Sequence, residues 1–412
     1  MLSQGRRKTD EIMKTAIIIF SLAFSPPSAF AAEKEDLPEA FRASAKEAID
    51  LSYAGKFDRS EELLKELSEK YPEHPFGYYG IAMVKWEKEY LEGELEHSSK
   101  AGEYDSLIEK TLEIGKKWLK KHPGDANAHM CMGGMYGLKG MLYITRHKWL
   151  KAYFSGKRGV KSLKRALEID PELYDAYMGL GLYEYSAATL PSAIKWLSKF
   201  VMPGDAKKAL EYLELCKDKG YFNSVAAKLF LIEVFTMHKS PYSNPELAVE
   251  WSKELFDVYP RHAQMHFVYI TSLHFAGRYD EAEKELMKYL ARIEAGDPGY
   301  EKKFLPRGIV SLGTVRMARG EYFEALELFE KAALALREGG NRSRWSVWGL
   351  VRMGNIYDIL QDRKRAVEFY TEAGSYGESG GFKPYLEAYL KNPFHEHLLP
   401  DPLPPPPWMI CI

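Results

Sequence analysis

The sequence predicts an all-α fold, a right-handed superhelical solenoid of about eight helix pairs. Apolar residues recur at i, i+3, i+4 and i+7, and no run alternates with period two, which is the helical pattern. One spacing of small and large residues occurs twice with identical intervals: Gly313, Ala325, Phe329, Ala332 and Gly354, Ala366, Tyr370, Ala373. A proline follows a small residue by twelve positions four times: Ser60–Pro72, Thr111–Pro123, Gly159–Pro171 and Ala248–Pro260.

Residues 1–31 are expected to be a cleavable secretory signal. Met13 is the expected start, because Lys14 and the apolar run 15–24 follow it directly. Small residues at 29 and 31 place the cleavage after Ala31, and no cysteine follows that could carry a lipid anchor. The mature chain is therefore expected to be exported, to the periplasm if the source is a Gram-negative bacterium.

Residues 32–392 are assigned to the solenoid, whose first pair covers about 41–74 with a turn at Gly55. The second pair, 75–123, is longer than the repeat requires. The interval between Gly133 and Gly159 is 26 residues, and that between Gly181 and Ala209 is 28, where the pattern requires twelve. Because the extra residues are helical in character, we expect lengthened helices in pairs two to four.

The later pairs return to the regular spacing. Turn glycines Gly277 and Gly320 precede the sixth and seventh second helices, whereas Gln361 takes this place in the eighth pair. Residues 384–391 are expected to form a capping helix, which covers the open end of a solenoid. The proline-rich tail, 393–412, has two interpretations: it packs on its own solenoid, or it is a ligand for a partner's aromatic groove.

These turns, close-contact glycines and terminal prolines resemble the tetratricopeptide repeat family, in its exported bacterial form, over roughly residues 40–375. The resemblance implies helix pairs whose first helices line a concave binding surface. The central region, including 178–183, 189–191 and 204–205, also resembles the tetratricopeptide repeat protein 39 family. That second likeness implies shared architecture much more than shared function.

The family's groove positions, mapped from each close-contact glycine, define a predicted partner-binding trough. Asn355 and the adjacent Arg352 match part of a carboxylate clamp, but the family's lysines are missing. The trough is otherwise apolar and rich in methionine, so it either binds a partner or belongs to the core. Its residues are Met130, Gly134, Met178, Leu182, Tyr185, Val310, Thr314, Met317 and Asn355.

A basic segment, 139–165, contains nine Lys or Arg residues and no acidic residue, with aromatic residues interleaved. It is either an amphipathic helix that contacts an anionic membrane surface or a solvated face neutralised by acids such as those at 92–96. The predicted contact residues are Arg146, Lys148, Trp149, Lys151, Lys157 and Arg158.

Catalytic motifs are absent from the sequence, so neither an enzyme nor a cofactor is predicted. Gly179-Leu180-Gly181 has no preceding strand and no third glycine, and it does not form a dinucleotide fingerprint. His262 and His266 lie four residues apart, but no third metal ligand of fixed geometry is evident, so no metal site is predicted. With 57 basic and 58 acidic residues, a nucleic-acid binder that depends on overall positive charge is excluded.

The functional prediction is a non-enzymatic adaptor or scaffold of the cell envelope that binds a protein or peptide in the concave groove. The alternative is a carrier of lipid or an apolar small molecule in the same trough, docked on membrane through 139–165. The sequence names neither the partner nor the oligomeric state.

Overall fold

A computed structural model describes residues 34–92, 101–146, 148–189, 204–237, 240–338, 343–377 and 382–395. Within these ranges the chain forms α-helices and one short 3-10 helix, η2 (Lys302–Phe304), and no strand. The predicted signal segment, and the tail from 396 onward, lie outside the described residues. The all-α prediction is confirmed.

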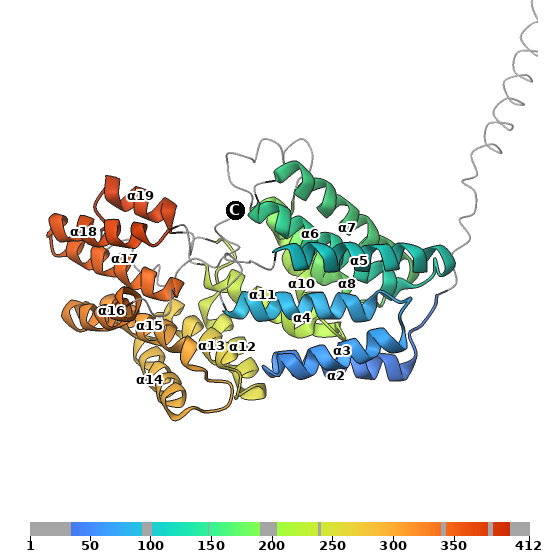
Figure 1. The fold of residues 1–412 in the computed structure, drawn as a ribbon, viewed down its shortest axis with the longest axis horizontal. Coiled ribbons are helices and arrows are strands. Elements are labelled where there is room, and N and C mark those ends of the chain that lie inside the picture. Colours follow the sequence, from blue (N-terminus) through green and yellow to red (C-terminus); the bar gives the residue numbers. More distant parts are fainter. Residues whose placement is uncertain are drawn as a thin grey trace, which may run out of the picture.

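Within the described ranges the helices form eight pairs and a terminal helix, as the repeat spacing predicts (Figure 1). The first four pairs are α2 (Glu39–Tyr53) with α3 (Phe57–Lys70), α4 (Phe76–Glu92) with α5 (Ala101–Lys121), α6 (Ala126–Thr145) with α7 (Trp149–Ile169), and α8 (Ala176–Ala188) with α10 (Ala206–Lys219).

The last four pairs are α11 (Ser224–Thr236) with α12 (Pro245–Val258), α13 (Ala263–Phe275) with α14 (Tyr279–Ala295), α15 (Leu305–Ala318) with α16 (Tyr322–Arg337), and α17 (Arg344–Ile359) with α18 (Arg363–Ser375). The terminal helix, α19 (Lys383–Lys391), packs on α18 at the position predicted for a cap. Beyond it, Phe394 is buried and its backbone N–H donates to Asp358, so the first residues of the tail pack on the solenoid.

Lengthened helices are present in the second and third pairs. Helices α5 and α7 have 21 residues each and α6 has 20. In the fourth pair α8 and α10 have ordinary lengths of 13 and 14 residues, and the extra residues between them, 190–203, lie outside the described ranges.

Four of the turns within pairs share one backbone conformation. The second residue after the first helix has positive φ at Gly55, Gly277 and Gly320. The N–H groups of this residue and the next donate back to carbonyls of the helix's last turn. This is the hydrogen-bond arrangement with which glycine usually ends a helix. Gln361 makes the same two bonds with φ 62°, so the eighth turn keeps the geometry without a glycine.

The solenoid curves until its first pair contacts the fifth and sixth. The rings of Tyr53 and Tyr259 lie 6.3 Å apart, and those of Phe57 and His262 lie 5.9 Å apart. A Cβ atom added at Gly55 would lie 3.0 Å from the His262 ring. Figure 1 accordingly shows α2 and α3 beside α12 and α13. Tyr53 accordingly shares a core cluster with Tyr185 of the fourth pair, Leu231 of the fifth and Met265 of the sixth.

No helix in the described part of the chain combines the length and the apolar character that crossing a bilayer requires.

Candidate functional site

Most of the predicted groove residues belong to the protein core. Gly134, Met178 and Leu182 are partly exposed. The prediction of an open trough is wrong for the other six, and the alternative interpretation as core is correct for them. These six have exposed fractions of 5% or less: Met130, Tyr185, Val310, Thr314, Met317 and Asn355.

The burial has two causes. In the N-terminal pairs, α2 and the residues before it fill the inner surface, so that Met130 shares a cluster with Leu37 and Phe41. In the C-terminal pairs, the first helices α15 and α17 contact each other directly, and Val310 and Met317 lie in that cluster.

Asn355 is committed to a buried polar network. Its side-chain amide donates to the Tyr370 hydroxyl at 2.9 Å, and its oxygen accepts from Arg352 at 3.1 Å. The Tyr370 hydroxyl in turn donates to Asp358 at 2.8 Å. Asn355 is therefore not available to hold the carboxylate of a partner.

Gly134 lies at the contact between α6 and α4. A Cβ atom added there would lie 2.5 Å from the Tyr79 ring of α4. Glycine at this position lets α4 and α6 approach, and burial raises the pKa of the Tyr79 hydroxyl.

The basic segment is partly neutralised and partly exposed. Arg146 is not a free cation, because it forms an ion pair with Asp105 at 2.9 Å. Lys139 likewise forms an ion pair with Glu109. Trp149 is half-buried. The remaining predicted contact residues are exposed on α7 or at its start: Lys148, Lys151, Lys157 and Arg158.

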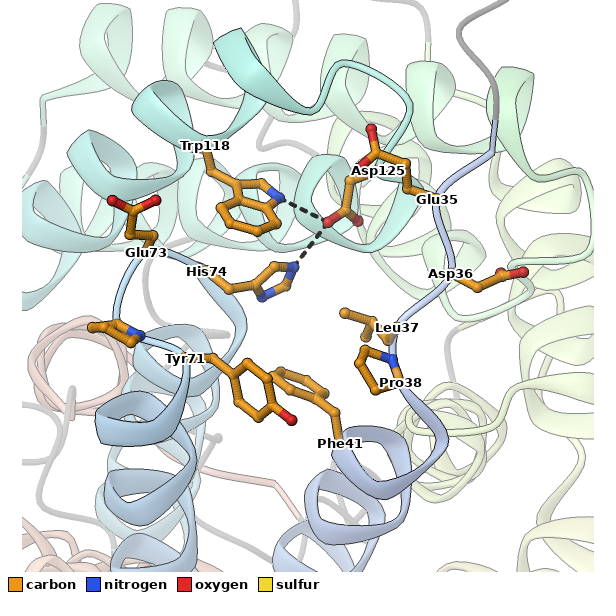
Figure 2. A pocket seen from close by; sticks show the side chains of 11 residues that line it. Glu35, Asp36, Leu37, Pro38, Phe41, Tyr71, Glu73, His74, Trp118 and Asp125 are labelled. Carbon is orange, nitrogen blue, oxygen red and sulfur yellow. Dashed lines mark hydrogen bonds and ion pairs between the residues drawn. The ribbon is translucent and has the colours of Figure 1, made fainter.

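A cavity of about 360 Å³ lies at the N-terminal edge of the solenoid (Figure 2). Three segments that are distant in sequence form its walls: residues 35–41, the turn 71–74 between α3 and α4, and the end of α5 with the residues that follow it. The Glu35 N–H donates to the Gly124 carbonyl at 3.2 Å, which holds the first segment against the third pair. The wall of the cavity is mainly aromatic and apolar, and consists of Leu37, Pro38, Phe41, Tyr71, Pro72, His74 and Trp118.

The rings of this pocket support one another. The Phe41 ring lies 4.9 Å from Tyr71 and 5.4 Å from His74 in edge-to-face arrangements. His74 lies 5.1 Å from Trp118, again edge to face. Such pairs stabilise an aromatic wall beyond their buried area. The pocket is therefore preformed.

Asp125 provides a buried carboxylate at the pocket floor. One of its oxygens accepts from His74 Nε2 at 2.9 Å and from Trp118 Nε1 at 2.8 Å, and the other caps α6 by accepting from the Ala128 N–H at 2.8 Å. Burial by itself would raise the pKa of Asp125, but the bonds from His74, Ala128 and Trp118 outweigh it and hold this pKa below its usual value.

His74 is fully engaged in this arrangement. The Phe76 N–H donates to His74 Nδ1 at 3.2 Å, so the ring proton lies on Nε2 and points to Asp125. With both nitrogens bonded, His74 is not placed to act as a general base. The carboxylates of the lining are those of Glu35, Asp36, Glu73 and Asp125.

The mouth of the pocket is acidic. Glu35, Asp36 and Glu73 stand at its edge. Asp36 pairs with Lys34 at 3.2 Å and Glu73 with Lys121 at 3.0 Å, but these lysines lie outside the lining, which contains no Lys or Arg. Glu35 pairs with His122 at 2.6 Å, and His122 stacks on Trp118 with centroids 3.9 Å apart. An aromatic wall with an acidic mouth is chemically suited to a cation on an apolar stem.

Sequence reasoning did not identify this pocket. Its aromatic residues come from helix ends and from the segment before α2, and each by itself is an ordinary packing residue. The available signal was the cluster of aromatic residues, prolines and histidine at 71–76, which exceeds what a turn between two helices requires.

Among the residues that the structure describes, no group of three or more His, Cys, Asp or Glu could hold a metal ion. His262 packs against Gly55, and His266 bonds to Tyr300 and Glu285 at 3.0 and 3.1 Å.

No family model and no curated protein matches the chain. Solved structures similar to it include the Rap protein complexed with competence and sporulation factor, with 12% identity over 85% of this chain and 80% of that one and a TM-score of 0.43. Yeast Tom70 has 13% identity over 85% and 81%, with a TM-score of 0.40. A tetratricopeptide repeat protein from Parabacteroides merdae has 14% identity over 86% and 98%, with a TM-score of 0.33. Likeness of this size does not indicate what the chain binds.

Proposed function

We propose that this protein is a non-enzymatic adaptor of the cell envelope that binds a basic segment of a partner protein in its N-terminal aromatic pocket. The single observation that carries the proposal is the preformed cavity with an aromatic wall and an acidic mouth. It replaces the concave groove as the binding site, because most of the groove residues are buried.

A lysine or arginine side chain satisfies both parts of this pocket. Its aliphatic stem can pack on Phe41, Tyr71 and Trp118, and its charge can face the rings and the acidic mouth. A cation over an aromatic face contributes about 0.5–2 kcal/mol, and more when it is desolvated. Exposed carboxylates such as Glu73 add attraction and faster association.

The envelope role in this proposal rests on the predicted signal segment, residues 1–31. If cleavage occurs after Ala31, the mature chain begins three residues before Glu35, the first residue of the segment 35–41 that lines the pocket. N-terminal sequencing of the exported protein should then begin at Ala32. A mature protein that retains residues 15–24 would contradict this part of the proposal.

The adaptor proposal is tested by selecting peptides from a random displayed library against the full mature chain. Selected peptides should be enriched in lysine or arginine and should lose at least tenfold in affinity for Glu73→Lys. Glu113→Lys is the matched control, since Glu73 and Glu113 are both 67% exposed and each pairs with one lysine of α5. Enrichment of acidic or uncharged peptides, equal losses in the two variants, or no selected peptide would each overturn the proposal.

The alternative function as a carrier of lipid or an apolar small molecule loses its binding site. It requires an apolar trough that is open to a ligand, and six of the nine trough residues are core. The second part of this alternative is docking on a membrane, which involves a different surface, the basic segment 139–165.

A further inference from the structure

Helix α7 has one face in the core and one face in solvent. Its buried residues, Ser155, Gly159, Leu163 and Ala166, recur at helical spacing and face α6, with the Ser155 hydroxyl donating to the Tyr136 carbonyl at 2.8 Å. Added Cβ atoms show how close this contact is, because one at Gly159 would lie 3.1 Å from the Gly133 carbonyl. The orientation of α7 is therefore set, and its opposite face points outward.

The outward face carries two large apolar side chains in water. Leu150 is 65% exposed and Phe154 is 53% exposed, and they lie four residues apart, which places them on the same side of the helix. The ring centroids of Phe154 and Tyr153 lie 5.1 Å apart, and Trp149, on the same first turns of α7, is half-buried. Single exposed apolar residues are common, but an adjacent pair flanked by aromatic rings at one end of a helix indicates a contact surface.

The rest of this face is basic and lacks neutralising partners. Among the described residues, no acidic side chain lies within ion-pair distance of Lys148, Lys151, Lys157, Arg158, Lys161 or Lys164. Several lysines on other helices are paired with acids one turn away, as Lys65 is with Glu61 and Lys253 with Asp257. The sole acid on α7, Glu168, pairs with Arg165 at its far end.

From this combination we infer that the outer face of α7 docks on an anionic lipid surface. Helices that lie in the membrane interface place bulky apolar residues among the acyl chains and Lys or Arg beside the headgroups. Leu150 and Phe154 provide the first feature, and the unpaired cations along the helix provide the second. Their long stems can extend along the surface to reach headgroup phosphates.

An acidic protein partner is the weaker match. Such a partner would explain the cations, but its negative charge would not explain why Leu150 and Phe154 are exposed at the end of this face. A lipid surface uses both. Each cation near an anionic surface adds to the attraction, and the contact weakens with salt because the charges are exposed.

Vesicle cosedimentation of the full mature chain tests the inference. Vesicles of phosphatidylcholine with 30% phosphatidylglycerol should bind the protein at least tenfold more strongly than vesicles of phosphatidylcholine alone, and added salt should weaken this binding. The double variant Lys157→Glu/Arg158→Glu should lose at least tenfold. Leu150→Ser/Phe154→Ser should also lose binding, even though it changes no charge.

Two control variants make the same kinds of substitution, charge reversal and apolar to serine, on other helices. Lys116→Glu/Lys117→Glu reverses an exposed pair on α5, and Phe323→Ser removes a side chain that is 73% exposed on α16. Both should bind vesicles as the parent chain does. Equal binding to neutral vesicles, no binding to anionic vesicles, or a contact that needs the cations but not Leu150 and Phe154 would overturn the inference.

Discussion

At the residue scale, the close-contact glycines are required by their neighbours. A Cβ atom at Gly313 would lie 2.6 Å from the Phe329 ring, and one at Gly354 would lie 2.4 Å from the Tyr370 ring. Both rings are fully buried and cannot move aside. The intervals that place these glycines opposite their rings are the ones that defined the repeat in the sequence.

Gly313→Ala and Gly354→Ala should therefore each lower the free energy of unfolding by about 1–3 kcal/mol, as overpacking of a core does. Gly137→Ala is the control, because nothing lies within 4 Å of the added atom. That variant should be neutral or slightly stabilising. Urea unfolding measures all three, and equal effects at the three sites would refute the packing argument.

Gln361 occupies the turn position that is glycine in the first, sixth and seventh pairs, and it adopts the same positive φ. Its φ of 62° is costly for a residue with a Cβ, by about 1 kcal/mol or more. Gln361→Gly should raise the free energy of unfolding by about 0.5–1 kcal/mol, whereas Gly320→Ala, at the matching turn, should lower it. A thermal shift in the opposite direction for Gln361→Gly would show that the glutamine side chain contributes more than its backbone costs.

At the element scale, Asp125 links the start of α6 to the pocket. It caps the helix and also accepts the buried donors of His74 and Trp118. Asp125→Ala should cost about 2–4 kcal/mol of stability, because the cap is lost and buried donors lose their partner. The pKa of this group is lowered in the folded state, so its contribution is present above its unfolded pKa and is lost as the pH falls.

Asp205→Ala is the matched control for this prediction. Asp205 caps α10 in the same way, accepting from the Lys208 N–H at 3.1 Å, but no buried side-chain donor of a described residue bonds to it. Chemical denaturation should show a loss of about 0.5–2 kcal/mol for Asp205→Ala, the usual effect of a cap. A loss as large as that of Asp125→Ala would show that the pocket network adds nothing.

Elements were predictable where their signal is local. The intervals ending at Pro72 and Pro260 indicate the ends of α3 and α12 to within about two residues, since proline cannot continue a helix. The pocket was not predictable in this way. Leu37, Tyr71 and Trp118 come together only through the stacking of the first two pairs, which no short spacing records.

At the scale of the whole molecule, the contact between the first pair and the fifth and sixth determines where a partner can bind. The burial of Met130 and Tyr185 depends on how strongly the solenoid curves, and a repeat pattern does not state its curvature. The sequence therefore placed these side chains on the inner side, but could not tell whether that side is open.

Glu87 makes this contact sensitive to pH. It accepts from Ser52 at 3.0 Å near Tyr53 and Tyr259, and burial raises its pKa to about 7 despite the bond from Ser52. The folded state then holds a proton that the unfolded state releases from about pH 4.5 upward. Its contribution to stability is therefore lost as the pH rises from about 4.5 to 7, by at most about 3 kcal/mol, and is constant above.

Glu87→Gln removes this titration. Relative to the parent chain, the variant should gain stability at pH 8 but not at pH 5, when urea midpoints are compared at the two values. The same difference at both pH values would show that Glu87 is not buried at the contact.

The most direct test of the adaptor proposal is a double-mutant cycle between the pocket and a selected basic peptide, measured by isothermal titration calorimetry. The peptide's lysine is replaced by norleucine, which keeps the stem and removes the charge, and the protein carries Glu73 or Glu73→Lys. Norleucine should weaken binding to the parent chain at least tenfold and have a much smaller effect with Glu73→Lys, since coupled groups are not additive. Equal binding of the two peptides by the parent chain would contradict recognition of a cation in the aromatic pocket.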